Sequence, residues 1–245
     1  RPDTTLVSLM LVNNEIGVVH DIEELSAIAH SVGARFHCDA VQGLGWLPLD
    51  LGTLGVDALA LSGHKFGAPK GIGLLYIRNG VLIEPLLHGG GHERGARSGT
   101  QNVAWAVAMA TAVSIRQANA QAEVTRGASQ LAHFAGRVLS ETSAKLTGPT
   151  LDSGRRAPSI ASFTFATVSG EALLLELERQ GVICSSGSAC AAGSDEPSHV
   201  LTAVGINAET AQTAVRFSIG HDTTEEQLDE AVEALKVSLD RLGAN

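Results

Sequence analysis

The first third of the chain alternates short apolar runs with a helical segment and glycine-containing turns. The apolar runs have the length of strands and read TLVSLMLV, ARFHCDAV, DALALSG and GIGLLYIR. Between the first two lies DIEELSAIAHSVG, whose apolar residues recur at helical spacing. Because strands that alternate with helices are typical of βαβ units, this part predicts an α/β fold with a mostly parallel sheet.

The helical segment has recognisable signals at both ends. Asp21 is placed to cap its first turn, and Glu24 is the partner that a capping box requires. Gly33 is placed to end the helix. The apolar face would be formed by Ile22, Leu25, Ile28 and Ala29. In such a fold, the loops that follow the strands are where a ligand binds.

The second half of the chain has a different pattern. Residues 104–143 read as a long helix that connects two lobes, and a strand candidate, APSIASFTFATV, follows it. A helix, GEALLLELERQG, a loop of small residues and a final helix over Thr224–Leu242 come next. We therefore expect residues 1–121 to form part of a large α/β domain and residues 122–245 to form a smaller α+β domain.

Composition narrows the classes of protein to consider. With 245 residues and 44% hydrophobic content, the chain can bury a sizeable core. Its net charge is −9 and it has no basic stripe, which disfavours binding to nucleic acid or to an anionic membrane. The apolar runs are far shorter than the roughly 20 residues that span a bilayer. No secretory signal is visible either, so we expect no membrane association.

The cysteines indicate a reducing environment. Cys38, Cys184 and Cys190 are odd in number and lack CxxC spacing. This pattern disfavours both a disulfide framework and a zinc site. We therefore expect no metal and a cytoplasmic location.

A glycine-rich turn, SGHKFGAPKGIG, follows the strand-like run DALAL. Ser62, His64 and Lys65 supply donors there, and backbone N–H groups of such a turn can face an anion. The turn is not a Walker A loop, because Lys65 and Lys70 are followed by Phe and Gly in place of Ser or Thr. Taken alone, it would more often be a surface turn with two lysines.

The segment HCDAVQG adds a second set of polar groups at the end of the preceding strand. Asp39 and Gln42 can hold a protonated ring nitrogen and a phenolic oxygen of one flat heterocycle. Asp39 alone could equally cap a helix or a turn. Together with Lys65, however, it makes the arrangement that pyridoxal phosphate (PLP) requires: a Schiff-base lysine and a carboxylate for the pyridinium nitrogen.

Several motifs along the chain carry a family resemblance. They are LVSLMLVNNEIGVVHDI, HCDAVQG, SGHKFGAPKGIG, GGGHERGARSGTQN, SSGSAC and VRFSIGHDTTEEQLD. In this order they resemble the NifS/IscS-like cysteine desulfurases, a group within the class V aminotransferase family of fold type I PLP enzymes. The resemblance covers nearly all of the chain and implies an incomplete PLP-transferase-type large domain plus a small C-terminal domain. The family pattern begins before Arg1, so we expect the missing N-terminal lobe either to be encoded upstream or to be supplied by another chain.

The resemblance assigns roles around the cofactor. Lys65 matches the Schiff-base lysine, Asp39 the pyridinium partner and Gln42 the donor to the phenolic oxygen. Ser62 and His64 match phosphate-binding positions.

It also assigns residues for the substrate and for the partner subunit. Thr100 matches a residue that reaches the phosphate of the neighbouring subunit in the family's homodimer. Asn14 matches an asparagine near the cofactor ring and the substrate carboxylate. Arg216 matches the arginine that clamps the α-carboxylate, although without the resemblance it could be a surface arginine paired with a nearby glutamate. Cys190, in a loop of small residues, matches the nucleophile.

The reaction that the resemblance implies is the conversion of L-cysteine to L-alanine. Lys65 would shift the α-proton, and the thiolate of Cys190 would take the sulfur as a persulfide for an acceptor protein, such as an iron–sulfur scaffold or a tRNA-thiolation relay. His92 is a candidate assistant to that thiolate, while Cys38 and Cys184 are expected to be packing thiols. Two alternatives stay open: a non-catalytic interaction module, and a class V aminotransferase or selenocysteine lyase.

Overall fold

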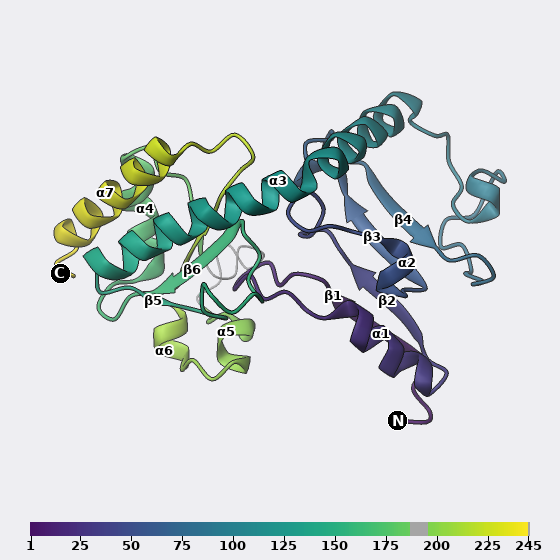
Figure 1. Ribbon diagram of the computed structural model, residues 1–245, viewed down its shortest axis with the longest axis horizontal. Helices are drawn as coiled ribbons and strands as arrows, with labels where there is room; N and C mark the ends of the chain where they lie inside the picture. Colours follow the sequence, from purple (N-terminus) through teal and green to yellow (C-terminus); the bar gives the residue numbers. More distant parts are fainter. Residues whose placement is uncertain (187–195, 245) are drawn as a thin grey trace. The chain divides into compact units, whose positions relative to one another are not determined.

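The structure is a computed structural model that describes residues 1–186 and 196–244 (Figure 1). The chain divides into two compact units. Unit 1 contains residues 1–11 and 20–121, and unit 2 contains residues 12–19 and 122–245. Val12–Val19 therefore belongs to unit 2, although the sequence on both sides of it belongs to unit 1.

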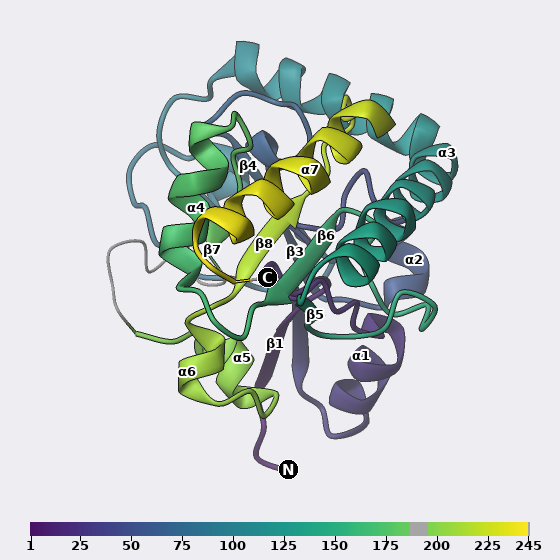
Figure 2. The same cartoon turned by 90° about the vertical axis from the view of Figure 1, so that its left-hand side faces the viewer.

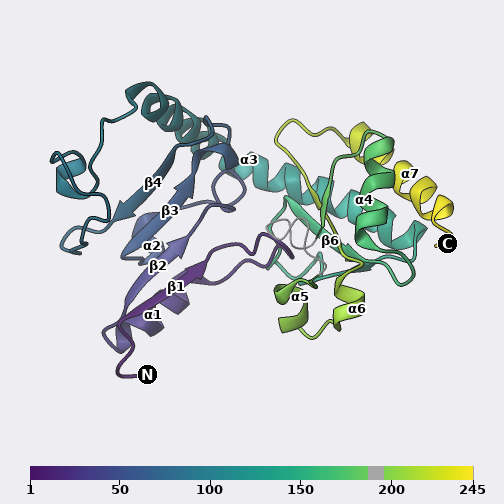
Figure 3. The same cartoon turned by 180° about the vertical axis from the view of Figure 1, so that it is seen from behind.

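Unit 1 is built on a four-stranded sheet, visible in Figure 3. Its strands, in their order across the sheet, are β1 (Leu6–Met10), β2 (Arg35–Asp39), β3 (Ala58–Ser62) and β4 (Gly73–Ile77). β1, β2 and β3 are parallel, and β4 runs antiparallel to β3. The mostly parallel sheet confirms the α/β class predicted from the sequence.

Helix α1 (Ile22–Ser31) follows β1 and has the predicted start and stop. The Asp21 side chain accepts a hydrogen bond from Glu24 N at 3.1 Å, and Gly33 follows the C-cap with a φ of +80°. Ile22 and Ala29 are buried as expected, but Ile28 is 57% exposed. The remaining short helices of unit 1 are α2 (Leu51–Leu54), η1 (Gly63–Lys65) and η2 (Glu93–Gly95).

The long helix predicted from the sequence is α3 (Val103–Glu141), and the unit boundary falls within it, between Gln121 and Ala122. It has 39 residues. None of the helices in the described parts of the chain, α3 included, is both long and apolar enough to cross a membrane.

Unit 2 contains a second four-stranded sheet, and all of its neighbouring strands are antiparallel. In order across the sheet, its strands are β5 (Lys145–Leu146), β6 (Ile160–Thr164), β8 (Val215–Ser218) and β7 (Ser185–Ser186). Its other helices are α4 (Gly170–Arg179), α5 (His199–Ala203), α6 (Ala208–Ala211) and α7 (Glu225–Arg241). Figure 2 shows α4, α7 and the C-terminal part of α3 on the same face of this sheet.

An aromatic cluster forms the centre of the unit 2 core. The rings of Phe134 in α3, Phe163 in β6 and Phe217 in β8 lie 5.1 to 6.2 Å apart between centroids. Side chains alternate along a strand, so the residues next to Phe163 in β6 and next to Phe217 in β8 point to the opposite face of the sheet. On that face Arg216 of β8 lies across from Ser162 of β6. The same sheet thus buries an apolar core on one side and presents polar groups on the other.

The buried carboxylate of Asp57, just before β3, forms hydrogen bonds with residues of α1 and β2. The Asp57 side chain, 3% exposed, accepts hydrogen bonds from Phe36 N at 2.8 Å, His30 Nε2 at 2.8 Å and Arg35 Nη1 at 3.2 Å. Burial alone would raise the pKa of Asp57, but these donors outweigh burial and hold that pKa below its ordinary value. The charged carboxylate therefore stabilises the junction of α1 and β2 with the start of β3.

Replacing Asp57 by Asn should lower the free energy of unfolding by about 1–3 kcal/mol near neutral pH, because an amide cannot satisfy all three donors. The folded-state pKa is depressed, so the charge stabilises the protein above the ordinary carboxyl pKa of about 4 and loses this effect as the pH falls through the folded-state pKa. Urea unfolding of both proteins over this pH range measures it. Asp3→Asn, at an exposed carboxylate, is the control. An equal difference at acid and neutral pH would contradict the assignment.

Candidate active site

The polar residues predicted from the sequence in unit 1 lie at one edge of its sheet. Asp39 is the last residue of β2 and Ser62 is the last residue of β3. The two strands are parallel, with Asp39 opposite Ala60, so their carboxyl ends meet at the same edge. This is the edge at which α/β sheets bind their ligands.

The turn after β3 presents Lys65 on a firmly held backbone. Gly63 N donates to Ile72 O at 2.9 Å, and Ala68 N donates to Gly63 O at 3.0 Å. Phe66, which is only 2% exposed, packs into a small apolar cluster beside Lys65. Lys65 itself is exposed. A solvent-accessible amine therefore stands on a turn that is fixed at both ends.

The remaining groups at this edge are of the kinds that PLP requires. Ser62 Oγ and His64 Nδ1 lie 2.9 Å apart. The Asp39 side chain accepts a hydrogen bond from Val41 N at 3.0 Å, which fixes the carboxylate at the strand end. A lysine amine, a carboxylate, a hydroxyl and an imidazole together fit a phosphate-bearing pyridine aldehyde.

The other residues predicted from the sequence in unit 1 lie outside its strands. Gln42 is half-buried in the segment after β2. Thr100 is exposed in the segment between η2 and α3. His92, the candidate assistant, has its Nδ1 2.8 Å from Gln101 Oε1.

Unit 2 brings together the two residues predicted to bind the substrate. Arg216 Nη1 donates to the carbonyl oxygen of Asn14 at 2.8 Å, across 202 residues of sequence. Both residues are half-buried. This bond orients the guanidinium, whose planar fork is suited to a carboxylate.

Asn14 lies in a hairpin formed by Val12–Val19, the segment that unit 2 takes from between β1 and α1. Val12 and Val19 form an antiparallel bridge, and Asn13 N donates to Val18 O at 2.8 Å. The Asn13 side chain accepts from Glu15 N at 2.9 Å and from the next backbone N–H at 3.0 Å. The two asparagines thus have different roles: the Asn13 side chain closes the turn, and the Asn14 carbonyl oxygen accepts the hydrogen bond from Arg216.

A half-buried arginine that the sequence did not single out, Arg156, helps to hold this hairpin in place. The Arg156 Nη1 group donates to Ile16 O and Ile160 O at 3.2 Å each, and Nε donates to Pro149 O at 2.8 Å. Nη2 donates to Pro149 O and to Thr147 O. Burial lowers the pKa of Arg156 to about 10, which still leaves it charged at neutral pH. One cation therefore joins the hairpin to β6 and to the chain before it.

Two glycines permit the close approach of these segments. Gly148 has a φ of +73°, and a Cβ built there would lie 2.7 Å from Ile16 O. Gly17, with a φ of +71°, would place a Cβ 3.1 Å from Ile160 O. Side chains at these positions would push the hairpin away from unit 2.

The amino-acid sequence matches a known protein family. The sequence pattern described as aminotransferase class-V matches residues 1–231. The chain belongs to that family. It is 42% identical, over 99% of its length, to a protein from Dictyoglomus turgidum named cysteine desulfurase IscS.

Solved structures agree with the class-V assignment. A NifS-like protein superposes with a TM-score of 0.85 at 35% identity, over 98% of this chain. A structure described as SspA in complex with cysteine superposes with a TM-score of 0.71 at 33% identity, over 89% of this chain. The present chain spans 61% of the length of the Dictyoglomus protein, 62% of the NifS-like protein and 60% of SspA.

The described part of the chain contains two cysteines, Cys38 and Cys184, whose thiols are protonated at neutral pH. Burial, reinforced by the charge of Asp39, raises the pKa of Cys38 to about 12. Burial also raises the pKa of Cys184 to about 12. Cys38 is fully buried and Cys184 packs against the unit 2 core, as expected for packing thiols. Cys190, the predicted nucleophile, lies outside the described residues.

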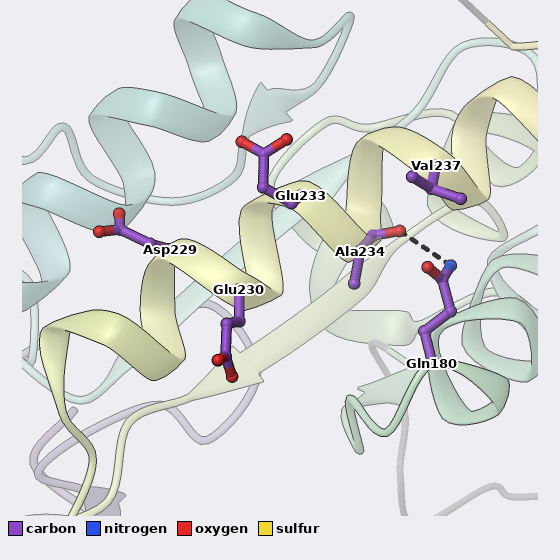
Figure 4. A pocket seen from close by; sticks show the side chains of 6 residues that line it. All are labelled: Gln180, Asp229, Glu230, Glu233, Ala234 and Val237. Atoms are coloured by element: carbon purple, nitrogen blue, oxygen red, sulfur yellow. Dashed lines mark hydrogen bonds between the residues drawn. The ribbon is translucent and has the colours of Figure 1, made fainter.

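A pocket on the surface of unit 2 is lined by residues other than those predicted from the sequence to form the site (Figure 4). It is lined by Gln180, Asp229, Glu230, Glu233, Ala234 and Val237. Arg137 donates to Asp229 Oδ1 at 2.8 Å and to Glu233 Oε1 at 2.7 Å, so these acidic groups already have a cationic partner. Gln180 Nε2 donates to Ala234 O at 3.1 Å. The groups around this pocket thus hold α7 against α3 and the end of α4.

The Arg156 contacts predict a large effect of a conservative substitution. Arg156→Lys keeps a charge but cannot supply five donors in a fork, so buried carbonyl groups lose their partners. We expect the free energy of unfolding to fall by about 2–4 kcal/mol. Urea unfolding followed by tryptophan fluorescence and circular dichroism measures the loss. Arg155→Lys, at the exposed neighbouring residue, is the matched control, and equal stability of the two variants would contradict the role of Arg156.

Proposed function

We propose that this chain is part of a PLP-dependent cysteine desulfurase, which removes the sulfur of L-cysteine and leaves L-alanine. One observation carries the proposal: β7 pairs Ser185 directly with Arg216, and Cys190 follows only five residues after Ser185. Five residues of chain extend over at most about 18 Å. The predicted nucleophile is therefore tethered within reach of the residue that we assign to the substrate carboxylate.

Arg216 has the chemistry for that assignment. A guanidinium forms two parallel hydrogen bonds with a carboxylate, which orients an amino acid as well as binding it. Asn14 O holds Arg216 Nη1 at 2.8 Å, so the fork is positioned by the backbone before a substrate arrives. Preorganisation of this kind reduces the entropy lost on binding. The similar SspA protein was solved in complex with cysteine, which supports an amino acid of this size for the present site.

Asp39, Ser62, His64 and Lys65 would hold PLP at the edge of the unit 1 sheet, with Gln42, Asn14 and a partner subunit's copy of Thr100 as further contacts. When bound, PLP supplies the electron sink that makes the α-proton of an amino acid acidic. Asp39 would keep the pyridine nitrogen protonated, and Ser62 and His64 would bind the phosphate. Lys65 would attach the aldehyde and then move the α-proton of the substrate at its Nζ atom.

Cys190 would complete the reaction as the sulfur nucleophile. Its thiolate attacks the sulfur of cysteine, the Cβ–S bond breaks and a proton is added at Cβ, so that cysteine and one enzyme thiol become alanine and one enzyme persulfide. Cys38 and Cys184 are poor candidates for this role, because a pKa of about 12 leaves almost no thiolate at neutral pH. A sulfur nucleophile also separates this reaction from that of an aminotransferase acting on another amino acid.

The persulfide sulfur would pass to an acceptor protein, such as an iron–sulfur scaffold or a tRNA-thiolation relay. A homodimer would bring Thr100 of one subunit to the cofactor of the other. A reducing cytoplasm fits a chain that relies on free thiols.

The role of Lys65 predicts a specific spectroscopic loss. Lys65→Ala should remove the visible absorbance of lysine-bound PLP and lower kcat by about 10²–10⁴-fold, because the amine that holds the aldehyde and moves the proton is gone. Lys70→Ala, at an exposed lysine on the same turn, is the control and should keep both. An unchanged PLP band in Lys65→Ala would contradict the assignment.

The role of Cys190 predicts a loss of chemistry without a loss of cofactor. Cys190→Ser should reduce alanine formation from cysteine by at least about a thousandfold, as happens when a covalent nucleophile is removed, and should leave PLP bound. Trapping with an alkylating reagent followed by mass spectrometry detects the persulfide. Cys184→Ser should still form it. Normal turnover in Cys190→Ser would rule out the persulfide mechanism.

A further inference from the structure

A second cavity lies in unit 1, at the strand ends opposite to those that carry Asp39 and Ser62. It has a volume of about 300 Å³, at the lower end of the range for ligand pockets. It is lined by His30, Gly33, Ala34, Arg35, Asp57 and Arg78, all of which belong to unit 1. None of them was predicted from the sequence as a functional residue, and the proposed chemistry uses none of their side chains.

The strand directions explain where this cavity lies. Arg35 is the first residue of β2, and Asp57 comes just before β3. Arg78 directly follows β4, which runs antiparallel to β3, and its backbone N donates to Asp57 O at 2.8 Å. Asp39 lies at the other end of β2, a strand of five residues, and is therefore about 13 Å from Arg35. The cavity is thus separate from the edge proposed to hold PLP.

The wall of the cavity has an excess of positive charge. Arg35 and Arg78 supply two positive charges, and Asp57 supplies one negative charge. The net charge is therefore +1 when His30 is neutral and higher when it is protonated. The chain as a whole has a net charge of −9. A local excess of cations on an acidic protein favours an anionic ligand at this place.

The hydrogen-bond donors of this wall are only partly used by the protein. The Asp57 carboxylate accepts from Arg35 Nη1 at 3.2 Å and from His30 Nε2 at 2.8 Å. Arg78 Nε donates to Val56 O at 3.1 Å, which holds the second guanidinium beside the cavity. No described residue accepts a hydrogen bond from Nη1 or Nη2 of Arg78. Since each guanidinium has five N–H donors, several are left for a ligand.

A structural role accounts for only part of this arrangement. Arg35 and His30 already stabilise the charge of Asp57. Arg78 forms no ion pair with a carboxylate in the described part of the chain, and a neutral donor could replace its bond to Val56 O. A second guanidinium beside the first adds repulsion between like charges, unless an anion lies between them. The pair of arginines is therefore explained better by a ligand than by packing.

We propose that the cavity formed by His30, Arg35 and Arg78 binds the phosphate group of a small ligand. The planar fork of each guanidinium can donate two parallel hydrogen bonds to phosphate oxygens. His30 supplies a further donor when its ring is protonated. A bound phosphate would join the start of β2 to the end of β4, so it should also stabilise the folded protein. The inference does not depend on the proposed function.

The test is isothermal titration calorimetry of the protein with inorganic phosphate at constant ionic strength. The protein is first incubated with PLP and then freed of the excess, because PLP itself carries a phosphate. We expect a Kd in the millimolar range or below, weakened at least about tenfold in Arg78→Gln and in Arg35→Gln. Arg78→Lys keeps the charge but loses the fork, so its affinity should lie between those of the wild type and Arg78→Gln.

A second titration identifies the source of the phosphate group. Glycerol phosphate, a phosphate monoester, replaces inorganic phosphate in the same experiment. Tighter binding of the monoester would support an esterified ligand, and tighter binding of inorganic phosphate would support the free ion. If the wild-type protein binds neither, the proposal is overturned.

Matched variants separate this cavity from other sites and from effects on folding. Arg155→Gln, at an exposed arginine of unit 2, should leave phosphate binding unchanged. Thermal unfolding is measured for every variant. If Arg35→Gln does not fold, Arg78→Gln decides the case, because it leaves the donors to the Asp57 carboxylate in place. Wild-type affinity in Arg78→Gln overturns the proposal, and so does binding that is lost in Ser62→Ala but kept in Arg78→Gln, since phosphate would then occupy the cofactor site.

Discussion

The hydrogen bonds of Arg156 join the Val12–Val19 hairpin to the rest of unit 2. They satisfy backbone carbonyl groups from the hairpin, from β6 and from the chain between β5 and β6 with a single cation. Backbone hydrogen bonds from Val19 N to Arg155 O and from Ala157 N to Gly17 O, both 2.8 Å long, join the same segments. With them, Asn14 and Glu15 become part of unit 2, although the residues before and after the hairpin belong to unit 1.

The sheet of unit 2 determines the direction in which the Arg216 side chain points. Val215 and Phe217 point into the aromatic core, which fixes β8 between β6 and β7. Arg216, between them, must point to the other face because side chains alternate along a strand. A one-residue shift of β8 would bury the guanidinium in the core and expose two apolar side chains. The packing of phenylalanine rings thus determines on which face of the sheet the Arg216 side chain lies.

The parts of the fold that rest on local signals could be predicted from the sequence. The N-cap at Asp21, the helix now seen as α3 and the final helix after Thr224 depend on neighbouring residues, and the structure has them close to the predicted bounds. The sheet edge with Asp39 and Lys65 also followed from the strand pattern, because parallel strands bring their carboxyl ends together.

The hairpin and its contacts could not be predicted in this way. Arg156 meets Ile16 across 140 residues, and Ser198 meets Glu15 across 183. Nothing in VNNEIG indicates that Glu15 is buried, and nothing in DSGRRAPS indicates that Arg156 is half-buried. The burial of a charge depends on donors and acceptors brought by distant segments, so hydrophobic periodicity does not reveal it. The assignments of Arg216 and Cys190 came from family resemblance and were also beyond the reach of local patterns.

The burial of Cys38 and Cys184 has a consequence for the fate of sulfur. With a pKa of about 12, each thiol is ionised in a fraction on the order of 10⁻⁵ at neutral pH. Exchange of sulfur between cysteines requires a thiolate to attack, so these two are nearly inert as recipients. Under the proposed function, neither thiol would readily take sulfur from a persulfide on Cys190. Burial of Cys38 and Cys184 would thus limit transfer of that sulfur to other cysteines of the same chain.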